Sequence, residues 1–291
     1  MTVSPNRSST CAQTVRLRRE THVQTIEHRD DWQKKYDRWN SNRSQKANDK
    51  IDGYPFVRNH EAPFTPAHRA LSMINLAVIS SAGAYIDGTD SFDLKAAGGD
   101  VGFREIPSEI DPADLRFSAR GYDPVFVSQD SNVQVPLERL FEFQANRIIG
   151  QLNSVFWSFC GFIPDAGRLA DEMLPKLVER LHRYEVQNAL LIPASPLCHQ
   201  SVSLAARAIE ESGIATMTLA VARDVVEAVR PPRAAFYAGQ PGCVVGRPNW
   251  PEHQRRILDE ALRWIEPMGT PGIRPLVVEL ESQVEAARGE R

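Results

Sequence analysis

One stretch of the chain, LLIPASPLCHQSV at residues 190–202, has the residue types and spacing that predict chemistry. Its aliphatic start predicts a buried strand, and the segment from Cys198 onward predicts a helix. Cys198 falls near the first turn of that helix, where unpaired N–H groups and the helix dipole stabilise a thiolate. We therefore expect Cys198 to be a nucleophile with a lowered pKa.

His199 follows Cys198 directly and is a candidate acid or base. Adjacent residues on a helix point about 100° apart, so the spacing does not ensure a Cys–His contact. The alternative is that Cys198 is an ordinary half-buried thiol and that His199 caps the helix.

Ser81 and Gly83 follow another aliphatic run, Ile74–Ser80, which predicts a core strand. Their backbone N–H groups are candidate donors to a carboxylate or an oxyanion. A plain tight turn explains the same residues.

Residues 85–135 are rich in Gly, Asp and Pro but also contain many aromatic and aliphatic residues. Loops of this length are usually functional or disordered, and this composition favours an ordered excursion that covers part of the molecule. The polar residues that we expect there as contacts to an amine or a water are Glu105, Tyr122, Asp123, Asp130 and Asn132. Surface capping is the alternative for each of them.

The cysteines and histidines give no metal-binding pattern. Cys11, Cys160, Cys198 and Cys243 are widely spaced, which argues against a disulfide framework and a structural zinc site. The other histidines lack the tight spacing of metal ligands, and we expect neither a metal nor a cofactor; they are His22, His28, His60, His68, His182 and His253.

The elements that must position these groups alternate between strand and helix. Predicted strands lie near 74–80, 154–159, 189–192, 214–219 and 234–237, and predicted helices near 136–147, 165–184, 198–212 and 250–266. Such alternation indicates parallel pairing with right-handed crossovers. The predicted fold class is α/β, with a doubly wound sheet or two related α/β lobes, and ligands are expected outside the carboxyl ends of the strands.

The N-terminal region differs from the rest. Residues 1–50 hold eleven Lys or Arg against six Asp or Glu and few aliphatic residues, so they cannot form a core alone. We predict an arm over 1–58, flexible or packed on a partner subunit, and an α/β domain over 59–291 with possible lobes 59–150 and 151–270. Trp32, Tyr36 and Trp39 would share one face of a helix.

Composition excludes several classes of protein. Hydrophobic residues make up 42% and charged residues 24%, with a formal net charge of −3, which is typical of a folded water-soluble chain. No apolar run is long enough for a membrane helix, and the first residues lack the apolar core of a signal peptide. We expect a cytoplasmic protein with a small-molecule substrate, a possible homodimer or thiol-reductant partner, and neither membrane nor nucleic-acid binding.

The segment Leu190–Leu219 resembles the active-site region of the selenoprotein B family, which includes subunits of the glycine, sarcosine, betaine and D-proline reductases. Its relatives carry a loop similar to Cys-Pro-x-Cys-His-Gln-Thr, in which the first cysteine is sometimes selenocysteine. The resemblance extends over roughly 60–267. Supporting pieces are Phe103–Pro107, Gly121–Asp123, Gly161–Asp165 and Gly246–Pro248.

The resemblance implies reductases in which a selenol or thiol attacks an activated carbon and breaks a C–N bond. This chain departs from that pattern because Ser195 stands where the first Cys or selenocysteine would be. A hydroxyl cannot replace a soft selenolate nucleophile or form a dithiol pair. In addition, no histidine precedes Tyr122-Asp123, and Cys160 or Cys243 is a candidate replacement thiol.

The leading hypothesis is an enzyme that acts through Cys198 on a small polar or amino-acid-like metabolite, by reductive cleavage or by a redox-neutral derivative of it. One alternative is a racemase, lyase or decarboxylase similar to the aspartate/glutamate racemases, which Ser81 and Cys198 facing each other across one pocket would favour. The other is a non-catalytic binding subunit.

Overall fold

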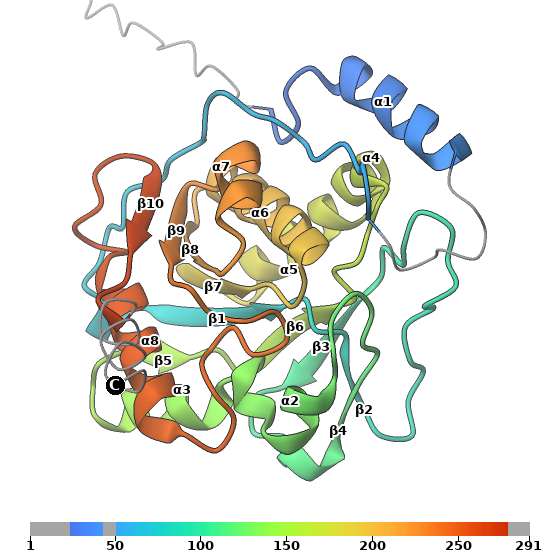
Figure 1. Ribbon diagram of the computed structural model, residues 1–291. Helices are drawn as coiled ribbons and strands as arrows, with labels where there is room; N and C mark the ends of the chain where they lie inside the picture. The colour runs from blue at the N-terminus through green and yellow to red at the C-terminus, as the bar shows by residue number, and fades with distance from the viewer. Residues whose placement is uncertain (1–23, 43–50, 279–291) are drawn as a thin grey trace, which may run out of the picture.

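The computed structural model describes residues 24–42 and 51–278, and its centre is one mixed β-sheet (Figure 1). Seven strands follow one another across the sheet in the order β10 (Gly272–Pro275), β9 (Arg233–Phe236), β8 (Ala215–Ala220), β7 (Asn188–Ile192), β1 (Asn75–Ser80), β6 (Val155–Phe159) and β3 (Phe103–Pro107). The short β5 (Gln151–Leu152) pairs with the start of β1. All these pairs are parallel except β3 with β6, which confirms the α/β class.

The strands form where the sequence has short runs of aliphatic and aromatic residues. Every residue of β7 and β8 is buried, as expected for parallel strands covered on both faces. All five strands predicted from the sequence are present, with ends that differ by one or two residues.

Alternate side chains of the sheet pack into two separate cores. On β1, Ala77 and Ile79 face one core, and Leu76 and Val78 face the other. The first core is covered by α4 (Ala166–Arg168), a π-helical turn over Leu169–Met173, α5 (Leu174–Arg183), α6 (Pro196–Glu211) and α7 (Arg223–Val229). The second is covered by α3 (Leu137–Ala145) and α8 (Pro251–Arg263) on the opposite side (Figure 1).

The helix predicted from the aromatic spacing near the N-terminus is α1 (Arg29–Asn42). Trp32 and Tyr36 are buried against the body of the same chain, and the Trp32 indole N–H donates to the Pro55 carbonyl at 2.7 Å. The described part of the predicted arm thus packs on its own chain. The rest of the arm, residues 1–23 and 43–50, lies outside the described residues.

The excursion after β1 is ordered, as predicted. It contains a two-stranded antiparallel sheet formed by β2 (Ala84–Ile86) and β4 (Leu115–Phe117). It also contributes β3 to the main sheet and ends with α2 (Val125–Gln129). Short 3-10 turns complete the chain at η1 (Leu71–Met73), η2 (Pro112–Asp114) and η3 (Ser131–Val133).

The strand order has a switch point beside β1. The chain places β6 on one side of β1 and then crosses to β7 on the other side, so the carboxyl ends of these three strands meet at one edge of the sheet. Ligands of doubly wound sheets bind at such a point. Strands from 59–150 and from 151–270 share this one sheet, and the domain boundaries remain a prediction.

No helix within residues 24–42 and 51–278 has the length and hydrophobicity needed to cross a membrane.

Candidate active site

The loop between β7 and α6 places a sulfur atom at the switch point. Ser195 is the N-cap of α6, and its hydroxyl oxygen accepts a hydrogen bond from the Cys198 backbone N–H at 3.1 Å. Pro196 follows at the first helical position, where its missing N–H costs nothing. The sequence Ser-Pro-x-Cys therefore begins this helix and fixes Cys198 in its first turn.

The Ser195 hydroxyl also contacts the sulfur itself. Its Oγ donates to the Cys198 Sγ at 3.0 Å, and the thiol in turn faces the Ser81 carbonyl oxygen at 3.9 Å. One hydroxyl thus links the helix N-terminus to the sulfur. A donor in this position lowers the free energy of the thiolate.

The wall opposite the thiol consists of residues that follow β1 and β6. The Ser81 hydroxyl accepts from the Ala194 N–H at 3.0 Å, and the Gly161 N–H donates to the Ser81 carbonyl at 3.0 Å. A Cβ atom on Gly161 would lie 3.0 Å from the Cys198 Sγ and 2.5 Å from the Ser81 Cβ. Only glycine leaves room for the sulfur there.

The expected oxyanion donors of this wall are already engaged. The Ser81 N–H donates to the Ile192 carbonyl at 3.0 Å, and the Gly83 N–H donates to the Phe159 carbonyl at 2.9 Å. The interpretation of these N–H groups as anion donors is therefore wrong, because both extend the hydrogen bonding of the sheet. Ser81 instead shapes the wall of the site.

A segment of the excursion, residues 117–123, closes the site and is called the strap here. The Tyr122 hydroxyl donates to the Ala82 carbonyl at 2.7 Å, and the side chains of Phe117 and Tyr122 pack against Ala82, Ala194 and Cys198. Gly121 is exposed, yet a Cβ on it would lie 3.3 Å from the Ser195 Oγ. The sulfur site is thus one layer of residues below the surface.

Closure changes the electrostatics of the thiol. Cys198 is 1% exposed, and this burial raises its pKa, although hydrogen bonds from Ser195, Ser81 and the backbone oppose the effect. The predicted lowering of the Cys198 pKa is wrong for this closed state, because desolvation of the thiolate outweighs the N-terminus of α6.

Cys160 follows β6 and lies at the same edge. Its Sγ is 3.7 Å from the Ser118 carbonyl, and burial followed by the charge of Cys198 raises its pKa to about 12. The Arg120 guanidinium opposes this rise and lies 4.7 Å from the centre of the Phe162 ring. Sequence reasoning gave Arg120 no role, although it directly precedes the Gly-Tyr-Asp piece of the strap.

His199 points to a different neighbourhood. Its Nδ1 lies 2.7 Å from the Ser195 carbonyl oxygen, and its Nε2 accepts from the Val221 and Ala222 N–H groups at 3.0 and 3.3 Å. Complete burial lowers its pKa to about 4. Both nitrogens are therefore used to join the Ser195 loop to the end of β8, which favours the capping alternative over acid–base work.

Glu105 lies on β3, away from the sulfur. It accepts two hydrogen bonds from Arg180 of α5, both at 2.6 Å, and one from the Trp157 indole at 3.0 Å. The Arg180 bonds hold the pKa of Glu105 below its usual range. Its carboxylate therefore fastens the edge strand to α5.

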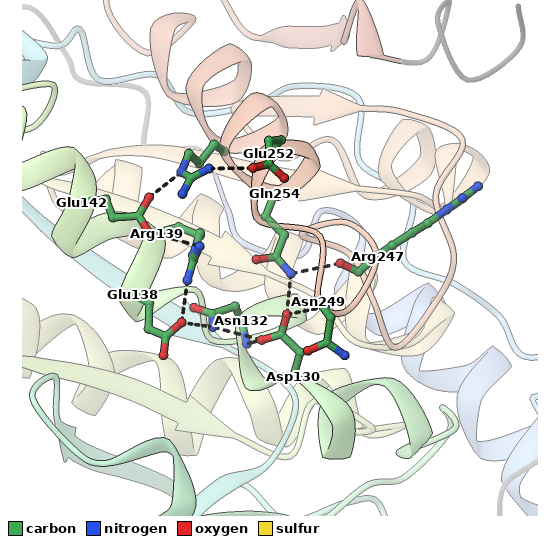
Figure 2. Close-up of polar contacts among 10 residues, drawn as sticks. Asp130, Asn132, Glu138, Arg139, Glu142, Arg247, Asn249, Glu252 and Gln254 are labelled. Atoms are coloured by element: carbon green, nitrogen blue, oxygen red, sulfur yellow. Dashed lines mark hydrogen bonds and ion pairs between the residues drawn. The ribbon is translucent and has the colours of Figure 1, made fainter. Parts of the chain in front are cut away.

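Asp130 and Asn132 belong to a polar cluster between the excursion, α3 and α8 (Figure 2). One Asp130 oxygen accepts from the backbone and side-chain nitrogens of Asn132, and the other accepts from Asn249 and Gln254. This Asp130 cluster comprises Asp130, Asn132, Glu138, Arg139, Glu142, Arg247, Asn249 and Gln254.

A cavity of about 690 Å³ borders the Asp130 cluster. Each oxygen of Asp130 already accepts two hydrogen bonds, and these bonds hold its pKa down although partial burial raises it. Asp123 likewise accepts from the Val125 N–H at 3.0 Å at the start of α2. The contacts of Asp123, Asp130 and Asn132 are those of capping residues, which was the alternative to a role in substrate binding.

One further group has the chemistry of metal ligands. The ligand atoms of Glu27, His28 and His60 all lie within 4.8 Å of one another. These residues are far in the sequence from the cysteines of the candidate active site. The wide spacing of the histidines, on which the expectation of no metal rested, did not reveal this approach.

Comparisons with known proteins place these features in context. Residues 50–194 match the family described as glycine/sarcosine/betaine reductase selenoprotein B. A relative, the D-proline reductase subunit gamma of Acetoanaerobium sticklandii, is 30% identical over 222 residues, which cover 76% of this chain and 90% of that protein. No solved structure matches the chain.

Proposed function

The chain belongs to the glycine/sarcosine/betaine reductase selenoprotein B family, and on this premise we propose that it is a reductase-type subunit that acts on a small amino-acid-like substrate through Cys198. The observation that carries the proposal is the 3.0 Å contact between the Ser195 hydroxyl and the Cys198 sulfur at the switch point. In the relatives that the loop resembles, the first Cys or selenocysteine stands at the position of Ser195. The serine thus keeps the contact of a redox pair but leaves one sulfur.

A single sulfur limits the chemistry in a definite way. The Cys198 thiolate would attack the substrate carbon, a C–S bond would form, and the amine would leave with its electron pair and take up a proton. A second thiol, from a reductant partner, would then attack the Cys198 sulfur. This step forms a mixed disulfide and releases the carbon with the bonding electrons, after which a proton is added.

The strap has to open for this reaction. In the closed state desolvation disfavours the thiolate, whereas the Ser195 donor and the α6 N-terminus favour it. Entry of water or a polar substrate would remove the unfavourable effect and keep the favourable ones. The closed structure is then a resting state, and movement of residues 117–123 activates the thiol.

Arg120 and Tyr122 of the strap are the groups that we propose for substrate recognition. The positive charge of Arg120 acts at Cys160, beside the sulfur site, and would attract the carboxylate of an amino acid. The Tyr122 hydroxyl reaches the Ala82 carbonyl and would close over the bound molecule. His199 is a positioning residue that fixes the Ser195 loop.

We test the reductase proposal with D-proline and glycine as probes and dithiothreitol as the reductant. Mass spectrometry should detect a product heavier than proline by two hydrogens, or ammonia release from glycine. Cys198→Ala should abolish the product, and Cys243→Ala should retain it because Cys243 lies in another cluster, with Val127 and Val133. Turnover that persists in Cys198→Ala would overturn the proposal.

The geometry of the lost redox pair has its own test. In Ser195→Cys, glutathione disulfide should oxidise the thiols at 195 and 198 to one disulfide and be reduced to two molecules of glutathione. We expect this bond because the Oγ–Sγ contact is already 3.0 Å. Failure to form it, in a variant that retains the native circular dichroism spectrum, would show that position 195 does not hold a redox partner.

A non-catalytic binding subunit is the second candidate, and the burial and raised pKa of Cys198 favour it. The expected results then differ: D-proline would bind without being consumed, and Cys198→Ala would bind it equally well. The racemase-type alternative has no such support, because the Ser81 carbonyl contacts the Cys198 sulfur at 3.9 Å, which leaves no space for a substrate between them, and both residues follow strands of one sheet.

The cellular setting follows from the thiols. Among the described residues, Cys160, Cys198 and Cys243 are free, and we place the protein in a reducing cytoplasm where they persist. A homodimer and a thiol-reductant partner complete the proposal. Sedimentation of the full chain measures the first, and the requirement for dithiothreitol measures the second.

A further inference from the structure

Glu27, His28 and His60 form a cluster of nitrogen and oxygen ligands on the side of the molecule where α1 packs. Glu27 and His28 directly precede α1, and His60 belongs to the extended segment that leads to β1. The ligand atoms of all three lie within 4.8 Å of one another. A single ion could therefore contact all three groups.

Hydrogen bonds hold this cluster together from both sides. The Glu27 carboxylate accepts from the His60 N–H at 2.7 Å and from the Glu61 N–H at 2.9 Å. The His28 carbonyl accepts from Asp31 and Trp32 N–H groups in the first turn of α1. These bonds use backbone atoms of the two histidines and one acceptor position on each Glu27 oxygen. The imidazole nitrogens and the second lone pair of a Glu27 oxygen therefore remain for a metal.

The His28 and His60 rings meet edge to face at the surface. Their centroids are 5.9 Å apart with an interplanar angle of 74°, and both residues are exposed. His28 has a φ of 50°, a left-handed conformation that is uncommon outside glycine. A cavity of about 480 Å³ is lined by all three cluster residues, which gives an ion and its water ligand access.

Charged neighbours set the strength of binding. Arg207 lies 3.5 Å from a Glu27 oxygen, and Lys35 and Arg58 line the cavity together with Asp31. The carboxylates of Glu27 and Asp31 attract a divalent cation. Arg207, Lys35 and Arg58 repel it. Imidazole ligands bind zinc and similar transition metals by coordination rather than by charge alone.

We propose that Glu27, His28 and His60 bind one divalent transition-metal ion of the Zn²⁺ class, with a fourth position left to water. The bound ion ties the start of α1 to the segment before β1. Three protein ligands with one open position are the arrangement typical of accessible zinc sites. This site is separate from the sulfur site and does not depend on the proposed reductase activity.

The test is a titration of the full chain, first freed of metal by a chelator, with Zn²⁺ and with Co²⁺ as a spectroscopic probe. We expect one ion per chain, visible absorption from four-coordinate Co²⁺, and a rise in melting temperature that the chelator reverses. His28→Asn and His60→Asn should each weaken binding roughly tenfold or more.

His68→Asn is the matched control, because His68 is exposed on the same extended segment and is outside the cluster. It should bind Zn²⁺ like the parent chain. Equal binding by His60→Asn and the parent, or Co²⁺ absorption that remains in the His28→Asn and His60→Asn variants, would overturn the proposal. The absence of any binding by the parent chain would overturn it as well. Because the substituted rings are exposed, the variants should keep the fold, and a loss of binding then reports the loss of a ligand.

Discussion

The sulfur site and the Asp130 cluster were both candidates from the sequence. Their central groups, the Cys198 thiol and the Asp130 carboxylate, differ in the contacts that they make. In the Asp130 cluster, each carboxylate oxygen of Asp130 accepts two hydrogen bonds (Figure 2). At the sulfur site, small residues from three strand ends surround one thiol, which contacts the Ser195 hydroxyl at 3.0 Å. A carboxylate with four hydrogen bonds, such as that of Asp130, stabilises the fold, whereas a sulfur at the switch point of the sheet is placed for chemistry.

Position in the sheet explains this difference. The sulfur site lies where the parallel strands β1, β6 and β7 end together at one edge of the sheet. The Asp130 cluster lies between α3, α8 and the excursion, where irregular backbone needs side-chain partners. The comparison predicts that changes at the cluster affect stability alone, whereas changes at the sulfur site also affect thiol reactivity.

The largest expected effect concerns the neutral His199 that holds the Ser195 loop. Its folded pKa of about 4 is below the unfolded value of 6.5, so protons bind preferentially to the unfolded chain. Stability is therefore fully present above pH 6.5 and falls as the pH decreases toward 4, by on the order of 3 kcal/mol. Urea unfolding at several pH values measures this loss.

His199→Gln is the variant that isolates the effect, because it removes the titrating group from the same position. The pH dependence between 6.5 and 4 should become shallower than in the parent chain. Identical slopes for both proteins would contradict the assignment of a buried neutral imidazole.

The next effect is expected at the Asp130 cluster. Asp130→Ala removes the acceptor of four hydrogen bonds and should lower the free energy of unfolding by about 2 kcal/mol. Asp123→Ala is the control, since Asp123 is exposed and accepts a hydrogen bond from the Val125 N–H at the start of α2. An Asp130→Ala variant of unchanged stability, or one that alters the reactivity of Cys198, would break the comparison.

Opening of the strap should change the reactivity of Cys198 more than it changes the stability of the fold. Gly121 has a φ of +78°, and a Cβ on it would lie 2.4 Å from the Phe162 ring. Gly121→Ala should favour the open strap and accelerate Cys198 alkylation by iodoacetamide about tenfold. Gly88→Ala has the same φ of +78° but no atom within 4 Å, so it should leave the rate unchanged. Equal rates in both variants would argue against the strap as the barrier.

The smallest effect is expected for the hydroxyl that contacts the sulfur. Ser195→Ala removes the N-cap of α6 and should cost about 1 kcal/mol of stability. It also removes the donor to Cys198, so the pKa of the thiol should rise further. Ser203→Ala is the control, because the Ser203 hydroxyl is buried on the same helix without a hydrogen-bond partner among the described residues. A Cys198 pH profile that is equal in both variants would contradict the role of Ser195.

The sequence predicted what depends on local pattern. The aliphatic runs of β1 and β7 identified the central strands. The segment from Cys198 onward identified α6 with Cys198 in its first turn, although the helix begins at Pro196 with Ser195 as its N-cap. The aromatic spacing of Trp32 and Tyr36 identified the buried face of α1. These features are set by neighbours within a few residues.

Long-range packing decided the rest. The pKa of Cys198 depends on the strap, which approaches from more than seventy residues away and buries the thiol. His199 turns to Val221 and Ala222, and Glu105 pairs with Arg180, contacts that no local pattern indicates. The approach of Glu27 and His28 to His60 is of the same kind.

The alkylation of Cys198 by iodoacetamide as a function of pH, read by mass spectrometry on the folded full chain, tests the central claim most directly. Cys160 and Cys243 serve as references in the same spectra. If Cys198 is the reacting sulfur of a site that opens, it should be modified faster than Cys160, whose pKa is about 12, and Gly121→Ala should raise the Cys198 rate more than the rates of Cys160 and Cys243. A Cys198 that stays unmodified while Cys160 or Cys243 reacts would contradict the account.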